Sequence, residues 1–310
     1  MWVIILSIVL GIIFLLLVGL FIGLSIIYWW VFYTPHKGQD NDFFFGDLDY
    51  QGHLEEAKEL ISRLSSMESE PVSIKSYDKL KLTGHLYKAN NNLNKVAIMC
   101  HGYRGTPRRD FSGGAIEMME LGYTVLLIDE RGHGGSDGHT ITFGIKEQLD
   151  VIRWIEYVKS MYGDSVSIVL VGISMGASTV LFASNKIDSD IKIIADCPYN
   201  SPKDIINNTI KKLGMSPKIY FPFVNLTSLI FAHTGLLKED AIKSVKESNN
   251  KILIIHGLSD TVVPYQLSEK IYLENKDKIR YETFPNAEHG ISYLLDRERY
   301  RKIIREFLEE

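Results

Sequence analysis

The first 33 residues carry no charged side chain, and this constrains the 310-residue chain more than any other feature. A helix needs about 20 consecutive apolar residues to cross a bilayer, so Met1–Tyr33 is long enough to span one. Tyr28, Trp29, Trp30 and Tyr33 lie at its end, and aromatic side chains of this kind favour the level of the lipid headgroups. We therefore predict a transmembrane anchor over residues 1–33.

A cleaved signal peptide is the alternative for this segment. Such a peptide begins with basic residues and ends with small residues before the cleavage site. The start Met-Trp-Val lacks the first feature, and the aromatic end lacks the second. We expect a retained, single-pass anchor in the cell membrane. Lys37 and an acidic stretch from Asp40 to Asp49 follow it, and we place the rest of the chain outside the cytoplasm.

The remaining residues are enough for one large domain. We assign residues 34–52 to a polar and aromatic linker and residues 53–310 to the domain. The net charge of −4 and the absence of a long basic run give no surface for nucleic acid. The two cysteines, Cys100 and Cys197, are predicted to be buried thiols. Their number excludes a disulfide framework, and no spacing of Cys and His resembles a metal site.

From residue 54 the apolar pattern alternates between two periods. Helical spacing begins at Leu54, and two strand-like runs follow at Val72–Ser76 and Lys81–Tyr87. Six further strand-like runs are Val96–Cys100, Thr124–Ile128, Ser167–Val171, Ile191–Ala195, Ile252–Ile255 and Arg280–Thr283. Helical stretches between them are Gly114–Leu121, Ile145–Tyr162, Ala177–Asn185 and Tyr265–Lys276. This alternation predicts an α/β fold, a mostly parallel sheet with helices on both faces.

One interval, residues 199–250, breaks the alternation. It holds no convincing strand, and Ile205–Leu213 and Val224–Leu237 have an apolar helical pattern. An insertion after the carboxyl end of a strand lies over the edge of the sheet where ligands bind. We predict a helical lid here.

The strongest local motif is Gly172-Ile173-Ser174-Met175-Gly176. It follows a strand-like run and precedes a helical one, which is the context of a nucleophile elbow. The sharp turn holds the serine at the edge of the sheet, with a helix N-terminus behind it. Ser174 is therefore the predicted nucleophile.

A serine hydroxyl needs a histidine to take its proton and a carboxylate to orient that histidine. In this arrangement the chain order is Ser, acid, His, and Asp260 and His289 follow strand-like runs in that order. His256 is a base by type, but it precedes Asp260 at a strand end and is assigned a structural role. Three other candidates are set aside because Asp296 lies in a predicted helix, Glu282 lies within a strand and His233 lies in the lid.

Two glycine-containing loops complete the motifs. In His101-Gly102-Tyr103-Arg104-Gly105, the Tyr103 N–H is predicted to stabilise an oxyanion together with the N–H of Met175. The second loop, Asp129–Ser136, contains a serine that lacks an elbow, so Ser136 is assigned a structural role. No Lys-Ser/Thr follows this loop, which argues against a phosphate site.

These motifs together resemble the α/β-hydrolase superfamily. The segments HGYRG, DERGHGGSDG, GISMG, HGLSDTVVP and AEHG occur in the expected order over about residues 72–309. They are similar to serine esterases, acylglycerol lipases and prolyl-oligopeptidase-like peptidases, including the serine aminopeptidase S33 type. The resemblance implies eight strands with the second antiparallel, a cap after the sixth, and Ser174, Asp260 and His289 as a triad. It implies Tyr103 and Met175 as oxyanion donors, and neither a cofactor nor a metal.

Three functions are open at this point. The first is hydrolysis of carboxylic esters, with a small-molecule or lipid-derived acyl substrate favoured by the apolar lid and the anchor. The second is a serine peptidase of the aminopeptidase or acylpeptide hydrolase type. The third is a binding protein that kept the fold without activity, which the intact set of motifs opposes. A dinucleotide-dependent redox enzyme is disfavoured because the GxGxxG motif with its downstream acid is absent.

Overall fold

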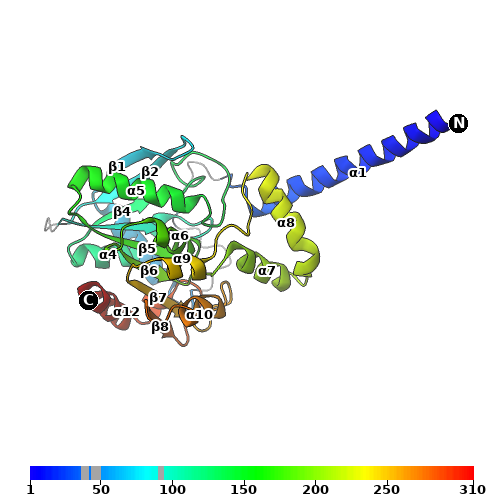
Figure 1. The fold of residues 1–310 in the computed structure, drawn as a ribbon. Helices are drawn as coiled ribbons and strands as arrows, with labels where there is room; N and C mark the ends of the chain where they lie inside the picture. Colours follow the sequence, from blue (N-terminus) through cyan, green and yellow to red (C-terminus); the bar gives the residue numbers. More distant parts are fainter. Residues whose placement is uncertain (36–41, 43–49, 90–93) are drawn as a thin grey trace.

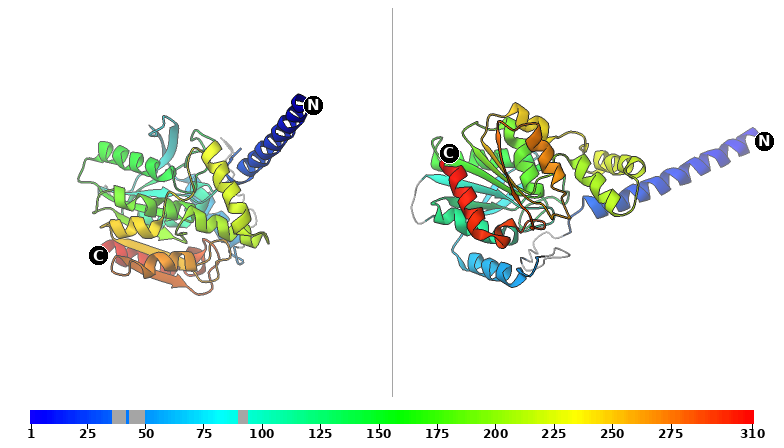
Figure 2. Two further views of the ribbon diagram at one scale, coloured as in Figure 1. Left: turned by 45° about the vertical axis from the view of Figure 1, so that its right-hand side comes forward. Right: turned by 90° about the horizontal axis from the view of Figure 1, so that it is seen from below.

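The computed structural model describes residues 1–35, 42, 50–89 and 94–310. A long N-terminal helix, α1 (Trp2–Val31), projects away from a rounded α/β body (Figures 1 and 2). Within the described residues, α1 is the one helix long and apolar enough to cross a membrane. None of the residues in its most apolar 18-residue stretch is buried against the body. The predicted linker 34–52 lies largely outside the described residues.

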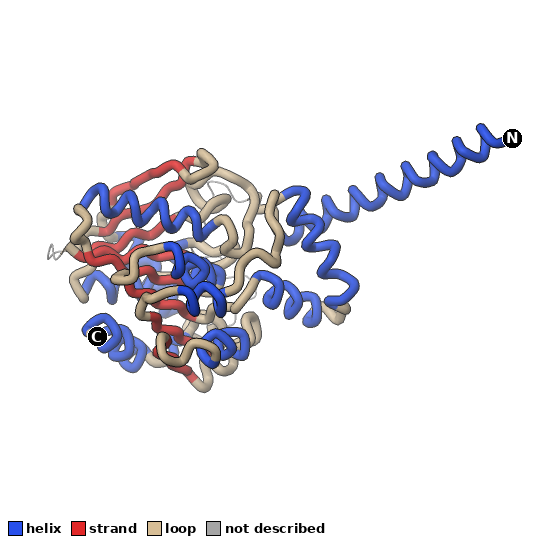
Figure 3. Tube along the Cα trace, viewed as in Figure 1, coloured by secondary structure: helices blue, strands red, loops and turns tan. Residues whose placement is uncertain are grey.

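The body is built on one twisted sheet of eight strands (Figure 3). The strand order is β1-β2-β4-β3-β5-β6-β7-β8, and β2 is antiparallel to both of its neighbours while the other pairs are parallel. The predicted sheet, with its antiparallel second strand, is confirmed. The strands are β1 (Glu70–Lys75), β2 (Lys81–Tyr87), β3 (Lys95–Cys100), β4 (Thr124–Ile128), β5 (Ser167–Ile173), β6 (Lys192–Asp196), β7 (Ile252–Gly257) and β8 (Ile279–Phe284).

Helices cover both faces of this sheet. One face packs against α5 (Glu147–Tyr162), α6 (Met175–Ala183), α9 (Ala241–Glu247) and α10 (Gln266–Leu273), and the other against α2 (Leu54–Ser66), α4 (Ser112–Glu120) and α12 (Arg297–Glu309). In β5, Leu170 faces the first layer and Val171 the second. Burial on both sides explains why the central strands appear in the sequence as continuous apolar runs.

Three helices fill the interval between β6 and β7. They are α7 (Pro202–Lys212), α8 (Pro217–Phe231) and α9. The helix predicted over Val224–Leu237 instead begins at Pro217, because a proline is well tolerated at the first helical position. It ends before His233, whose φ of 53° is incompatible with a continuing helix. The short α9 was not predicted; the side chain of Asp240 caps its first turn.

The last turn of α1 is part of the body. Phe32 is fully buried in the larger core cluster, and the hydroxyl of Tyr28 lies 2.5 Å from Oγ1 of Thr140. Tyr33 forms a β-bridge with the same threonine. The apolar helix and the α/β body are therefore joined by packed side chains and backbone hydrogen bonds.

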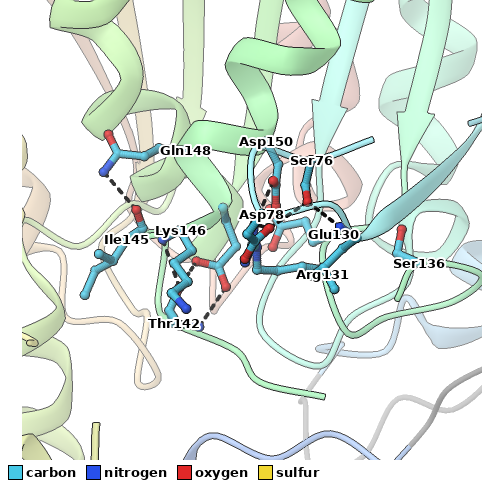
Figure 4. Close-up of polar contacts among 12 residues, drawn as sticks. Ser76, Asp78, Glu130, Arg131, Ser136, Thr142, Ile145, Lys146, Gln148 and Asp150 are labelled. Carbon is cyan, nitrogen blue, oxygen red and sulfur yellow. Dashed lines mark hydrogen bonds and ion pairs between the residues drawn. The ribbon is translucent and has the colours of Figure 1, made fainter. Parts of the chain in front are cut away.

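A buried ion-pair network fixes the loop that follows β4 (Figure 4). Arg131 donates from Nε and Nη2 to both carboxylate oxygens of Asp150, at 2.7 and 2.8 Å. It also donates to Asp78 in the β1–β2 turn at 3.0 Å. One guanidinium thus links this loop to α5 and to the edge of the sheet.

We predict that Arg131→Met destabilises the body by about 3–5 kcal/mol, because the change leaves the Asp150 carboxylate buried without its partner. The matched control is Arg153→Met, which removes an exposed pair with Glu156 and is expected to change stability by about 1 kcal/mol or less. Denaturant unfolding in detergent, followed by circular dichroism, measures both. Equal effects of the two variants would contradict the importance of the buried network.

Candidate active site

Ser174 lies on a strained turn between β5 and α6. Its φ of 54° and ψ of −114° are a conformation that residues with a side chain rarely adopt. The backbone N–H of Ser174 donates to the carbonyl of Asp196 at the end of β6, at 2.8 Å, which helps to hold the turn. The hydroxyl therefore lies at the carboxyl edge of the sheet, beside the N-terminus of α6.

The two glycines of the motif are required by close packing. A Cβ at Gly172 would lie 2.3 Å from the carbonyl oxygen of Gly176. A Cβ at Gly176 would lie 1.8 Å from the carbonyl oxygen of Cys100 in β3. Helix α6 can approach the sheet this closely only because neither residue has a side chain.

Asp260 and His289 reach Ser174 from two loops at the same edge of the sheet. Asp260 follows β7 and His289 follows β8. Nε2 of His289 lies 3.0 Å from Oγ of Ser174, and its Nδ1 lies 2.7 Å from Oδ2 of Asp260. The structure thus brings the three predicted residues into one continuous hydrogen-bonded chain.

The protonation of Asp260 and His289 is set by the groups that contact them. Oδ1 of Asp260 accepts the N–H groups of Val262 and Val263, at 2.8 and 2.7 Å. Burial opposes the ionisation of Asp260, but the neighbouring His289 and His256 outweigh it and hold the pKa of Asp260 well below its usual range. Burial likewise opposes protonation of His289, and the Asp260 carboxylate overcomes it and raises the pKa of His289.

The two predicted oxyanion donors flank the serine. Met175 is the first residue of α6, and Tyr103 lies in the loop after β3, whose Gly102 would place a Cβ 3.4 Å from Cβ of Ser174. Neither amide N–H donates to another group among the described residues. Both are thus available to a substrate oxygen. Gly102, by contrast, donates its N–H to Asp110.

The loop that contains Tyr103 is fastened to the end of α1. The Tyr103 hydroxyl donates to the carbonyl of Val31 at 2.9 Å. The Arg104 guanidinium donates to the carbonyls of Trp30 and Tyr33, each at 2.9 Å. The carbonyls of Trp30 and Val31 are the last two of α1 and have no partner within the helix, and a cation there also favours the helix dipole. No sequence pattern had indicated this contact.

A cavity of about 520 Å³ opens at Ser174 and His289. It extends along the face of the sheet that α4 and α12 cover. The wall is largely apolar and includes Met99, Phe111, Met118, Val171, Ile194, Leu294 and Ile304. No described residue of α7 or α8 belongs to the wall. The predicted lid therefore lies beside this cavity and does not line it.

Asp196 and Tyr300 are site residues that the sequence patterns did not single out. Asp196 ends β6 and lines the cavity, and its Oδ2 accepts from the Tyr300 hydroxyl at 2.9 Å. Its Oδ1 is buried without a hydrogen-bond partner among the described residues. Burial raises its pKa to about 6. A charged residue that ends an otherwise apolar strand was the available signal.

None of the residues that were set aside has a hydrogen bond to the serine hydroxyl in the described part of the chain. His256 is fully buried, donates from Nε2 to the carbonyl of Val263 at 2.9 Å, and lies 3.3 Å from Asp260. Ser136 bonds the backbone of Asp129. Asp296 caps the first turn of α12 rather than lying within it, Glu282 pairs with Arg280, and His233 is exposed after α8.

Both cysteines are free and buried, as predicted. The sulfur of Cys197 lies within 4.8 Å of ligand atoms of Asp260 and His289, so the three could in principle surround an ion. Burial raises the pKa of the Cys197 thiol well above its usual value. Metal ligation requires the thiolate, and the imidazole and carboxylate already bond to each other. This donor set therefore fits a metal ion poorly.

The chain is similar to several known proteins. The family described as serine aminopeptidase, S33, matches residues 91–218. An uncharacterized Bacillus subtilis protein, YqkD, is 24% identical over 94% of both chains. The lysophosphatidylserine lipase ABHD12 of Macaca fascicularis is 24% identical over 57% of this chain and 44% of its own. An uncharacterized membrane protein of Saccharomyces cerevisiae is 24% identical over 78% of this chain and 80% of its own.

Two solved structures show the same fold. The Pyrococcus furiosus esterase Pf2001 superposes with a TM-score of 0.64 at 24% identity and covers 89% of this chain and 98% of its own. The acylaminoacyl peptidase of Pyrococcus horikoshii gives a TM-score of 0.59 at 20% identity, over 80% of this chain and 43% of its own. The sheet and these matches together show that the chain has the α/β-hydrolase fold, and that residues 91–218 are similar to the serine aminopeptidase S33 family.

Proposed function

We propose that this protein is a serine hydrolase that cleaves carboxylic esters through an acyl-enzyme intermediate. The observation that carries the proposal is the continuous contact from Asp260 through His289 to Ser174, at 2.7 and 3.0 Å. Both are hydrogen-bond distances, and the 3.0 Å between Nε2 of His289 and Oγ of Ser174 is within the range in which a base can take a proton from a nucleophile.

The reaction follows from the position of each group. Oγ of Ser174 attacks the carbonyl carbon of the ester, and Nε2 of His289 takes the hydroxyl proton. Asp260 holds Nδ1–H and stabilises the imidazolium that forms. His289 then gives the proton to the leaving alcohol. A water molecule, activated by the same imidazole, finally hydrolyses the acyl-enzyme and restores the Ser174 hydroxyl.

The negative oxygen of each tetrahedral intermediate is assigned to the N–H groups of Tyr103 and Met175. Both flank the nucleophile, and neither has another acceptor among the described residues. One such donor typically contributes a factor of about 10²–10³ to the rate. The position of Met175 at the start of α6 adds the positive end of the helix dipole.

The substrate we propose carries an apolar acyl group. The cavity next to Ser174 is walled mainly by apolar side chains, and its volume of about 520 Å³ is within the range of small-ligand sites. Helix α1 is proposed to be a retained single-pass anchor in the cell membrane, because Phe32 and Tyr28 are built into the body. Its place at the bilayer suits a lipid-derived ester. The body is assigned to the side away from the cytoplasm.

A fluorophosphonate probe tests the nucleophile. Wild-type protein is expected to be labelled, and Ser174→Ala is expected to lose all labelling because His289 activates this hydroxyl. Ser259→Ala is the control, since that hydroxyl bonds the carbonyl of Pro285 and labelling should persist. Gel fluorescence after a timed reaction measures each. Labelling of Ser174→Ala equal to wild type would overturn the assignment.

The pH profile tests the Asp260–His289 pair. Only neutral imidazole accepts the serine proton, so kcat/KM should fall as the pH drops through the raised pKa of His289. Asp260→Asn removes the group that raises it. Its acid limb should therefore move to lower pH, with a rate loss on the order of 10⁴. Asp277→Asn, an exposed carboxylate on the body, should leave both unchanged. An unshifted acid limb in Asp260→Asn would contradict this pairing.

A second candidate function is cleavage of an aminoacyl amide. The observation that favours it is Asp196, which lines the cavity and whose Oδ1 has no hydrogen-bond partner among the described residues. A carboxylate there suits the ammonium group of an aminoacyl substrate, and it is ionised above its pKa of about 6.

A substrate panel separates the two candidates. For the esterase, p-nitrophenyl esters should be hydrolysed far faster than aminoacyl anilides, and Asp196→Asn should leave ester kcat/KM within a few-fold of wild type. For an aminopeptidase, anilides should be the better substrates, and the same variant should raise their KM. Faster hydrolysis of anilides than of esters would displace the esterase proposal.

A further inference from the structure

Helix α8 places apolar side chains outward and polar side chains inward, the reverse of an ordinary surface helix. Its exposed residues are large and apolar: Ile219, Tyr220, Phe223, Leu226, Leu229 and Ile230. Ile219 is 60% exposed and Leu229 is 50% exposed. After Lys218 the helix contains no charged residue. A helix in water places its polar residues outside, and α8 does the opposite.

The polar residues of α8 face the protein. Thr227 and Ser228 are fully buried, and the Ser228 hydroxyl donates to the carbonyl of Thr234 at 2.7 Å. The side-chain oxygen of Asn225 accepts the N–H of Leu236 at 2.9 Å. The inner face is thus bonded to the segment that follows α8. Rotation of the helix to bury its apolar face would break these bonds.

The anchor helix lies directly against α8 (Figures 1 and 2). Phe231 of α8 packs on Phe21 and Tyr28 of α1, with ring centroids 5.8 and 5.2 Å apart. Leu24, between these two positions, is the buried residue of α1. The apolar surface of α8 therefore continues the apolar surface of α1.

The place where α8 contacts α1 sets the depth of α8 relative to the bilayer. Residues 2–20 of α1 are exposed and, at 1.5 Å each, extend about 28 Å, close to the thickness of a bilayer core. Phe21 to Tyr28, which α8 touches, come next along the helix. Trp29 and Trp30 follow at the headgroup level. The position of α8 on α1 is thus at the boundary between acyl chains and headgroups.

We propose that the outer face of α8 is embedded in the surface of the lipid bilayer, alongside α1. The inference rests on the proposed role of α1 as a membrane anchor. A helix with one apolar face lies in the bilayer plane and buries that face about 5–10 Å deep. The protein then holds the membrane at two sites, a spanning helix and an interfacial helix, and the α/β body is fixed against the lipid surface.

Depth-dependent quenching tests the proposal on the full chain in lipid nanodiscs. A single cysteine that carries an environment-sensitive fluorophore is introduced as Phe223→Cys on α8. The native cysteines, Cys100 and Cys197, are buried and resist labelling in the folded protein. Met161→Cys, an equally exposed apolar position near the end of α5, is the matched control, and Leu15→Cys reports on α1.

The expected pattern distinguishes the three positions. The probe at 223 should have blue-shifted emission and be quenched more by a nitroxide at carbon 5 of the lipid chain than at carbon 12. The probe at 15 should be quenched at carbon 12, and the probe at 161 by neither. Equal behaviour at 223 and 161, with quenching at 15, would overturn the placement of α8. An unquenched probe at 15 would overturn it by removing the anchor.

A second variant links the placement to the proposed esterase. Phe223→Asp should weaken hydrolysis of a vesicle-borne ester by about tenfold, since it opposes burial of an aromatic side chain in lipid. Hydrolysis of a water-soluble short ester should stay within about twofold, because residue 223 does not line the cavity. Met161→Asp should alter neither. Equal losses on both substrates would contradict membrane docking, whereas no hydrolysis by wild type would remove the esterase proposal and leave the quenching result standing.

Discussion

The contact of α6 with β3 is the constraint on which the rest of the site depends. The backbone of Gly176 packs on the carbonyl of Cys100 with no space for a Cβ. This contact brings the start of α6 against the central strands, directly after the positive-φ turn at Ser174. The same contact places the N–H of Met175 beside the loop that carries Tyr103. The strain in the nucleophile turn is therefore sustained by the packing of the whole central sheet, which buries apolar residues on both faces.

The sequence predicted the parts of the fold whose patterns are local. Each central strand is a continuous apolar run, and the elbow, acid and histidine occur at strand ends in the order that the fold requires. The parallel sheet then brings those ends to one edge, although Ser174 and His289 are 115 residues apart in the chain. Short motifs were sufficient to predict these residues because the sheet topology, and not the local sequence, brings their side chains together.

The parts that were not predicted depend on contacts across the chain. Asp196 was only a single charged residue at a strand end, and its pairing with Tyr300 joins β6 to the last helix. The start of α8 was predicted too late: the helix begins at Pro217 and accommodates Pro222 within it. The hydrogen bonds from Arg104 to the end of α1 join segments with no shared motif. Such pairings are decided by tertiary packing, and no local pattern encodes them.

The attachment of α1 to the loop of Tyr103 and Arg104 has a consequence for how bilayer thickness acts on the protein. Hydrogen bonds and packed side chains join the end of α1 to the body. With α1 as the proposed membrane anchor, Ser174 would therefore stand at a fixed height above the hydrocarbon. A thinner or thicker membrane must then be accommodated by tilting the helix or deforming the lipid. Tilting would carry the whole body with it and press one side of its rim toward the headgroups. For the proposed lipid-derived ester, lipid composition would in this way set which substrate carbonyl comes level with Ser174.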